Sequence, residues 1–326
     1  MESFVSEIFL SNEIIIFLFL QTILYLLFCV ALFKSIQIVR FWDFSKSSSY
    51  QYNLEKSSYL TILIIVFSLF VKIFLFFYFI FTIDKLSVLI TGAMCATGVF
   101  STTIYGEFSL ALKVFTLFFC GVWLVLNHYD LKTKDYKYTK TKFVLFFPIF
   151  ILFSFEIILD YLFLLNIPVN STISCCSVIF GLDSLNSNIA FNLNITSLIL
   201  LFYLLYFLTL IVNFLNKTFL LVVVNLLFFY ISYFSIIYFF STYIYELPTH
   251  QCPFCMMQKE YNYIGYFIWG FLILGVFFAI CNFVLSLILK VKKQTLFNYS
   301  NIFNSLFVFL VSFYVIRYYI LNAVFL

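Results

Sequence analysis

The sequence predicts an all-α polytopic membrane protein, built as a bundle of about eight transmembrane helices. Of the 326 residues, 64% are apolar and only 10% are charged, whereas soluble domains carry about 25% charged residues. In addition, long apolar runs bounded by charge recur along the chain, and a helix of about 20 apolar residues spans the roughly 30 Å of a bilayer core. A water-soluble globule is therefore excluded. We expect the lipid bilayer to be a partner and nucleic acid not to be one.

Eight apolar runs are long enough to cross a membrane. They cover residues 13–39, 59–83, 107–127, 143–167, 195–215, 218–240, 263–289 and 302–325. No connection between them is long enough to bury a core of its own. We therefore expect a single transmembrane domain over residues 1–326.

The connections between these runs alternate in composition. One set is rich in Lys and covers residues 40–58, 128–142 and 290–301. The other set carries Cys, Gly and Asn but little positive charge, and covers residues 84–106, 168–194 and 241–262. The positive-inside rule places the Lys-rich set in the cytoplasm. Both termini and the cysteine-bearing outer loops are then expected outside, facing the periplasm or the exterior of a bacterial inner membrane.

Cysteines are concentrated in the outer loops. Five of the eight lie there, namely Cys95, Cys175, Cys176, Cys252 and Cys255. Thiols in an oxidising compartment form disulfides, bind metal or take part in redox chemistry. The adjacent Cys175 and Cys176 bridge to each other only with strain, so each is expected to pair elsewhere or to serve as a ligand. The three cysteines within the spans are interpreted as small packing residues.

The densest group of reactive residue types is YELPTHQCPFCMMQKEYNYIGY, residues 245–266. Cys252 followed by Pro253 predicts a helix start, because Pro is favoured at the first helical position. Cys252 would then cap this helix, where the dipole and unpaired N–H groups stabilise a thiolate. Cys255 would lie one turn further on the same face, as its resolving partner. His250 is left open as a ligand, a base for Cys252 or a polar loop residue.

The sequence CPFC at residues 252–255 resembles the active-site sequence of glutaredoxin-like thiol oxidoreductases. The resemblance covers four residues and implies thiol–disulfide exchange; no βαβ pattern surrounds it, so it implies neither their fold nor their substrates. The first functional hypothesis is a membrane thiol redox protein in which Cys252 and Cys255 cycle between dithiol and disulfide. Cys95, or Cys175 with Cys176, would relay electrons to an extracytoplasmic thioredoxin-like protein or to a membrane quinone.

The placement of methionine supports a second hypothesis. Of the three internal methionines, Met94 abuts Cys95, Met256 follows Cys255, and Met257 comes next. Thioether and thiolate ligands together suit copper(I). His250, Cys252 and Cys255 would then join these methionines as ligands of a soft cation, for transport or for delivery to a metal-carrying protein. A packing role for the methionines is the alternative.

A third, different possibility is a non-catalytic membrane subunit whose outer loops are tied by structural disulfides.

The first outer loop, residues 84–106, contains Cys95 and is unusual in composition. It holds three of the eight glycines around a small apolar centre. It is expected either as a re-entrant turn that carries Cys95 toward the bundle, shielded by protein, or as a plain surface loop.

Charged residues within the spans need an explanation, because each costs about 2.5–3.5 kcal/mol at a helix centre. Counting about 1.5 Å per residue places five of them in one layer: Lys72, Lys113, Glu156, Asp160 and Arg317. Lys72 and Lys113 are expected to pair with the two carboxylates, which lie four residues apart on one helix face. The pairs either fix helix packing or form a proton or cation relay. Arg317 would stabilise a thiolate or a reduced quinone.

Overall fold

The computed structural model describes residues 8–42, 48–93, 95–132, 138–168, 193–290 and 294–326. Eight helices in these ranges are long and apolar enough to cross a membrane, and the same ranges contain no strand. The prediction of an all-α bundle of about eight membrane helices is therefore confirmed. The placement of both termini outside stays a prediction.

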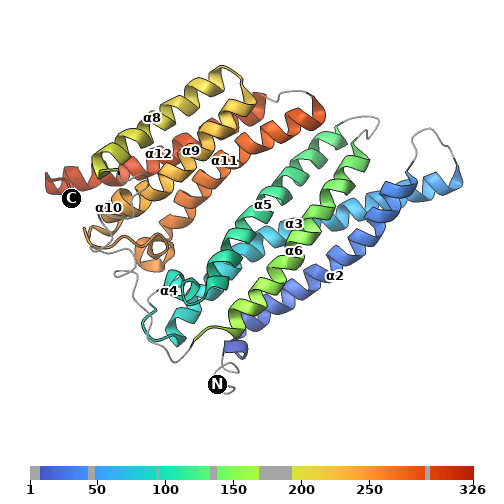
Figure 1. Ribbon diagram of the computed structural model, residues 1–326, viewed down its shortest axis with the longest axis horizontal. Helices are drawn as coiled ribbons and strands as arrows, with labels where there is room; N and C mark the ends of the chain where they lie inside the picture. Colours follow the sequence, from blue (N-terminus) through green and yellow to red (C-terminus); the bar gives the residue numbers. More distant parts are fainter. Residues whose placement is uncertain (1–7, 43–47, 94, 133–137, 169–192, 291–293) are drawn as a thin grey trace. The chain divides into compact units, whose positions relative to one another are not determined.

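The spanning helices follow the chain order shown in Figure 1. They are α2 (Asn12–Phe41), α3 (Ser49–Leu86), α5 (Ile104–Leu131), α6 (Thr139–Leu165), α8 (Ile195–Phe214), α9 (Thr218–Ser235), α11 (Ile264–Leu289) and α12 (Gln294–Asn322). Helix α9 continues through a π-helical turn, η4 (Ile236–Phe240), into α10 (Ser241–Tyr245). The short elements are η1 (Ser87–Leu89), α4 (Ala96–Phe100), η5 (Cys255–Met257) and η6 (Lys259–Tyr261).

Two helices, α3 and α12, begin a full turn of helix or more before the starts that the apolar runs predict, by more than the few residues of ordinary boundary error. The sequence assigns residues 40–58 to an inner connection, but α3 begins at Ser49. The Ser48 side chain accepts a hydrogen bond from the Gln51 N–H at 3.3 Å, and such a cap stabilises a helix start. Likewise, α12 begins at Gln294. Apolar runs mark the length that fits the bilayer, whereas capped polar turns extend the helices beyond it.

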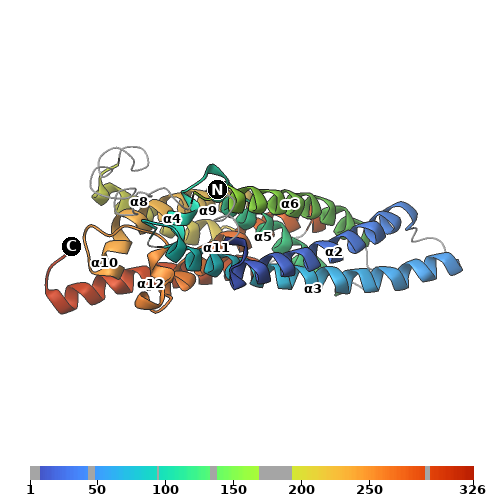
Figure 2. The same ribbon diagram turned by 90° about the horizontal axis from the view of Figure 1, so that it is seen from below.

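The helices fall into two compact units. Unit 1 comprises Met1–Thr91 and Val99–Ser171, and unit 2 comprises Gly92–Gly98 and Thr172–Leu326. In unit 1 the helices α2, α3, α5 and α6 pack in a ring, each against the next and α6 against α2. In unit 2 the helices α8, α9, α11 and α12 pack in the same cyclic order, as Figures 1 and 2 show. Each unit is thus a ring of two helical hairpins, and the single-domain interpretation stays a prediction.

The helices expose apolar side chains and bury many polar ones. Phe19, Phe33 and Phe74 are 63%, 68% and 71% exposed, which fits a surface covered by lipid tails. On α2 the buried positions recur every three or four residues and include Gln21 and Ser35. Because lipid is as apolar as Leu, polar residues at this spacing mark the inward face. The same pattern places the polar groups described below inside the units.

Candidate functional site

The connection between α3 and α5 turns back into the protein. All residues from Cys95 to Phe100 are buried, including the whole of α4. The backbone carbonyl of Phe100 occupies the space that a Cβ atom would take at Gly106, in the first turn of α5. Only glycine permits this close approach of the two backbones. Of the two expectations for this loop, the plain surface loop is therefore wrong, and Cys95 is 0% exposed.

The predicted helix start at Cys252 is also wrong. Cys252 lies outside any helix, Pro253 lies in a turn, and only the three-residue 3₁₀ segment η5 (Cys255–Met257) follows. The long helix α11 begins at Ile264. Cys252 therefore receives no stabilisation from the dipole of a long helix, and the reason for expecting a thiolate there is lost.

Long-range hydrogen bonds explain why no helix begins at Pro253. The Tyr245 hydroxyl donates to the carbonyl of Cys252, and the Trp269 indole N–H donates to the carbonyl of Pro253 at 3.1 Å. In a helix these carbonyls would accept from backbone N–H groups four residues later. Side chains from α10 and α11 take that role here, and they hold the CPFC segment as a turn.

Three sulfur atoms meet in unit 2. The Sγ atoms of Cys95, Cys252 and Cys255 all lie within 4.8 Å of one another, and those of Cys95 and Cys252 are 3.5 Å apart. The three residues are 0%, 1% and 5% exposed, and all three are thiols in this structure. The Thr97 hydroxyl lies 3.4 Å from Cys252 Sγ. The structure thus brings together three of the five outer cysteines in one buried group, the sulfur trio.

No protein-family model, curated protein or solved structure matches the chain. The function is therefore inferred from the residues themselves.

The electrostatic environment of the sulfur trio favours neutral thiols. Hydrogen bonds to Cys252 and Cys95, together with burial, raise the pKa of the Cys255 thiol. Since a thiolate is the nucleophile and the metal ligand, the trio needs a nearby positive charge to ionise. A bound cation supplies such a charge.

His250 and the two methionines lie beside the trio. The His250 ring packs edge-on against Tyr245, with ring centroids 4.3 Å apart. Its Nε2 is buried without a hydrogen-bond partner among the described residues, and burial lowers the pKa of the imidazole. Cγ atoms of Met256 and Met257 would lie 2.6 and 2.8 Å from a Cβ at Gly265. The methionines therefore pack on the first turn of α11, and their role as ligands stays a prediction.

The structure does not place four of the sequence-derived candidates in this group. Met94, Cys175 and Cys176 lie outside the described residues. Arg317 is exposed on α12, so its proposed action on a thiolate or a quinone stays a prediction.

Aromatic side chains fill the interior of unit 2 next to the trio. Phe202, Phe228, Phe240 and Phe307 are 0% exposed and belong to the same apolar cluster as the three cysteines. The Phe202 ring lies 5.1 Å from that of Phe240, 5.5 Å from that of Phe228 and 6.0 Å from that of Phe307. At such spacing the rings are in close contact. The trio therefore has a dry, densely packed apolar side.

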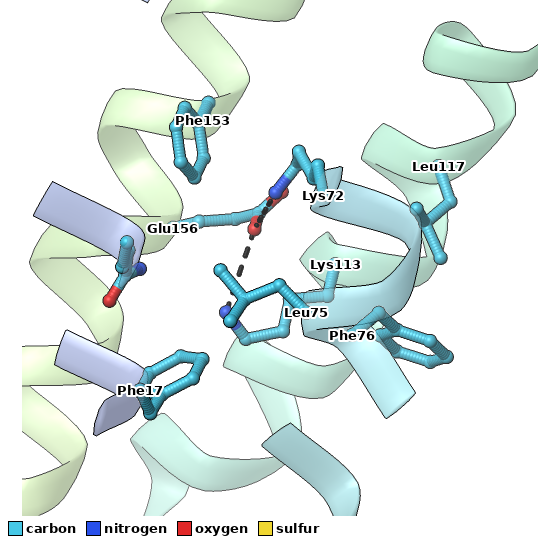
Figure 3. A pocket seen from close by; sticks show the side chains of 9 residues that line it. Phe17, Lys72, Leu75, Phe76, Lys113, Leu117, Phe153 and Glu156 are labelled. Carbon is cyan, nitrogen blue, oxygen red and sulfur yellow. Dashed lines mark hydrogen bonds and ion pairs between the residues drawn. The ribbon is translucent and has the colours of Figure 1, made fainter. Parts of the chain in front are cut away.

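Unit 1 contains a group of four charges, shown in part in Figure 3. Lys72 Nζ lies 2.7 Å from Glu156 Oε2, and Lys113 Nζ lies 2.6 Å from Asp160 Oδ2 and 3.6 Å from Glu156 Oε2. The pairing predicted for these side chains is present. With two cations and two anions, the group has no net charge.

Two further residues of this group were not predicted from the sequence. Gln21 Nε2 donates to Asp160 Oδ2 at 2.7 Å, and the Ser109 hydroxyl donates to Asp160 Oδ1 at 2.6 Å. All four helices of unit 1 therefore contribute to one network. The cavity beside it has a volume of about 10 Å³, which holds one water molecule at most. This geometry favours the packing role over a relay or a ligand site.

Two residues of the thiol site, Thr97 and Tyr245, were not among the predicted site residues. Thr97 contacts Cys252, and Tyr245 fixes the CPFC turn. Tyr245 does open the segment that the sequence singles out, and a Tyr with a polar tip next to an apolar span is a usable signal. Thr97 lies two residues after Cys95, and only the fold reveals its contact.

Proposed function

We propose that this integral membrane protein binds a soft metal ion, copper(I), through Cys95, Cys252 and Cys255. The observation that supports this most is the mutual distance of at most 4.8 Å among three buried sulfurs. Metal–thiolate bonds of about 2.3 Å place ligand sulfurs about 3.8 Å apart around a tetrahedral ion. In a disulfide the sulfurs are only about 2.05 Å apart. The 3.5 Å between Cys95 and Cys252 lies near the metal-site value.

The chemistry of the donors points to the class of ion. Soft sulfur ligands select copper(I) and related ions over hard cations such as Mg²⁺. When bound, the ion would supply the positive charge that allows the buried thiols to ionise. His250, whose buried Nε2 has no hydrogen-bond partner among the described residues, would add a nitrogen ligand if its ring turned toward the ion, since its nitrogens are not within 4.8 Å of all three sulfurs.

Burial distinguishes metal binding from exchange with a protein thiol. A mixed disulfide with a soluble partner needs an accessible sulfur, and the most exposed member of the trio, Cys255, is 5% exposed. A small ion needs much less space. Since the trio belongs to the same buried apolar cluster as four fully buried phenylalanines, we propose that the ion is held and exchanged at the outer face, with a metal-carrying protein as partner, rather than conducted through unit 2.

The position of Cys252 favours a second candidate, a thiol–disulfide relay. Cys252 lies 3.5 Å from Cys95 and within 4.8 Å of Cys255, so it is able to form a disulfide with either after a small shift. Each such step would release two protons and two electrons to a quinone or to the disulfide of a thioredoxin-like protein. In this function Cys252 is the sulfur common to both disulfides.

Titration of the purified full-length protein with copper(I) tests the first candidate. The reduced protein in detergent, without oxygen, competes for copper(I) with a chromophoric chelator. We expect one ion per chain, and a loss of at least tenfold in affinity on replacing any one of the three ligands by Ser, since hydroxyl is a poor ligand for a soft ion. Cys120→Ser and Cys281→Ser are matched controls, because these two cysteines are also 0% exposed but lie in α5 and α11.

Two results decide between the candidates. Equal copper affinity in the wild type and in Cys252→Ser would contradict the metal site. Isolation of the wild type with a Cys95–Cys252 or Cys252–Cys255 disulfide that turns over with a quinone would support the relay instead.

A further inference from the structure

Tyr245 lies against the CPFC turn at the end of α10. The following residue, Glu246, has φ of 54° and ends the helix in the left-handed conformation. The Tyr245 side chain is 5% exposed. Its ring packs edge-on against those of His250 and Tyr261, at centroid distances of 4.3 and 4.6 Å. These two rings fix the direction in which the Tyr245 hydroxyl points.

The Tyr245 hydroxyl joins the two sides of the turn. It donates a hydrogen bond to the carbonyl of Cys252 and accepts one from the N–H of Met256 at 2.9 Å. Cys252 is the first cysteine of the CxxC segment, and Met256 directly follows the second. One hydroxyl group therefore fixes the backbone at both ends of the segment that carries Cys252 and Cys255.

The fixed backbone matters because the two possible chemistries need different sulfur separations. An ion needs the sulfurs about 3.8 Å apart, whereas a disulfide needs about 2.05 Å. The structure keeps Cys252 and Cys255 at a non-bonded separation within 4.8 Å. Closure of a disulfide would require the turn to move, and the two hydrogen bonds of Tyr245 oppose that movement.

We propose that Tyr245 is the positioning residue of the sulfur trio: its hydroxyl holds Cys252 and Cys255 at the separation that an ion needs and prevents them from closing into a disulfide. This inference rests on the proposed metal-binding function. It adds to that function the residue that sets the balance between ion binding and oxidation.

Tyr245→Phe tests the proposal, because it keeps the ring and removes both hydrogen bonds. We expect copper(I) affinity to fall about tenfold, the change that corresponds to the loss of one or two hydrogen bonds. The sulfur-to-copper charge-transfer band in the ultraviolet is expected to shift as well. Tyr243→Phe is the matched control: Tyr243 is 2% exposed on the same short helix, and its hydroxyl donates to the Leu326 carbonyl at 3.2 Å.

Oxidation by diamide provides a readout that does not depend on copper. Cys252 and Cys255 each give up one proton and one electron as the S–S bond forms, and the azo group of diamide takes up both electrons and both protons to become a hydrazine. In a Cys95→Ser background, where Cys255 is the partner within reach of Cys252 among the described residues, we expect Tyr245→Phe to form this disulfide several times faster than Tyr243→Phe. Mass spectrometry of the alkylated peptides measures the rate.

The outcomes separate the two proposals. Equal affinity, equal spectrum and equal oxidation rate in Tyr245→Phe and Tyr243→Phe would overturn the role of Tyr245. A wild type that binds no copper(I) would overturn the metal function, while the diamide experiment would still test Tyr245. If Tyr245→Phe does not fold, 4-fluorophenylalanine at this position fills the para position but has no hydrogen to donate and is a very weak acceptor, and an oxidation rate unchanged from the wild type would then overturn the proposal.

Discussion

Unit 1 and unit 2 are rings of four helices in the same cyclic order, but their interiors have different chemistry. In unit 1 the buried polar groups include ions that neutralise one another, namely Lys72 with Glu156, Lys113 with Asp160 and Lys142 with Asp130. In unit 2 they are mainly amides, hydroxyls and thiols. The Asn304 side-chain amide donates to Asn225 Oδ1 at 2.8 Å, and the Ser300 hydroxyl donates to the Gly275 carbonyl at 2.7 Å.

This difference between the two interiors indicates which buried polar groups are able to bind a ligand. The charges of unit 1 are paired, and the space beside them holds one water at most, so they act on each other. In unit 2 three thiols that can ionise to bind a cation lie within 4.8 Å of one another. Two residues before Cys252, the buried Nε2 of His250 has no hydrogen-bond partner among the described residues. Buried polar residues thus either stabilise the packing of helices or form a binding site. Which of the two they do depends on whether their charges and hydrogen bonds are already satisfied within the protein.

The largest expected effect concerns the network of four buried charges in unit 1. Glu156→Gln removes the carboxylate that pairs with Lys72 and contacts Lys113. We expect a loss of about 3–5 kcal/mol in the free energy of unfolding, because a buried ammonium is left without its counter-ion. Thermal unfolding in detergent measures the loss. Copper binding by the folded fraction is expected to persist, since the trio lies in unit 2.

Two comparisons sharpen this prediction. Glu107→Gln is the control, because Glu107 is exposed in the first turn of α5. The double variant Lys72→Met with Glu156→Leu should recover part of the loss, since an apolar pair replaces a buried ion pair well. An unchanged free energy of unfolding in Glu156→Gln would show that the four charges do not stabilise unit 1. It would then favour the alternative that they form a proton or cation relay.

An intermediate effect is expected where the thiol site meets α11. In Gly265→Ala the new Cβ would lie 2.6 Å from Met256 Cγ and 2.9 Å from the Met256 backbone carbon. Overpacking of this kind costs about 1–3 kcal/mol, and relief by movement of the turn would displace Cys255. We expect about a tenfold loss of copper affinity. Gly270→Ala on the same helix is the control, because no described atom lies within 4 Å of its Cβ position; equal affinities in the two variants would contradict the prediction.

The smallest expected effect concerns Thr97. Thr97→Val removes the hydroxyl 3.4 Å from Cys252 Sγ and keeps the shape of the side chain. A single neutral hydrogen bond contributes about 0.5–1.5 kcal/mol, so copper affinity should change about threefold to tenfold. The chelator competition assay measures this change. Thr102→Val, which loses only a hydroxyl bonded to the Val99 carbonyl, should leave the affinity unaltered, and a larger effect there than at Thr97 would argue against a direct role of Thr97.

The transmembrane spans and some residues of the thiol site could be predicted from the sequence. The spans are predictable because the thickness of the bilayer sets the length of an apolar helix that crosses it. The ion pairs are predictable because charged side chains inside spans are costly unless they pair. Gln21 was also within reach, as an amide inside the first apolar run. Cys95, Cys252 and Cys255 were named as candidates, but only the fold shows that their sulfurs lie within 4.8 Å of one another; Cys175 and Cys176 lie outside the described residues.

The local structure around Cys252 was beyond the sequence. Pro253 predicts a helix start, yet Tyr245 and Trp269 supply the donors that a helix would supply from its own backbone. The π-helical turn at Ile236–Phe240 adds one residue to the helical repeat, so the periodicity of α9 does not predict where Tyr245 points. The two hydrogen bonds join residues 7 and 16 positions apart, and no helical periodicity predicts pairing at these spacings.

The sulfur trio joins parts of the chain that are far apart in sequence: Cys95 and Cys252 are separated by 157 positions. A cross-link that closes so long a loop restricts the conformations of the chain between its ends, and the restriction grows with loop length. Because this restriction acts on the unfolded chain, a bound ion would favour the folded state. We therefore expect the metal-bound protein to unfold at a higher temperature than the metal-free protein.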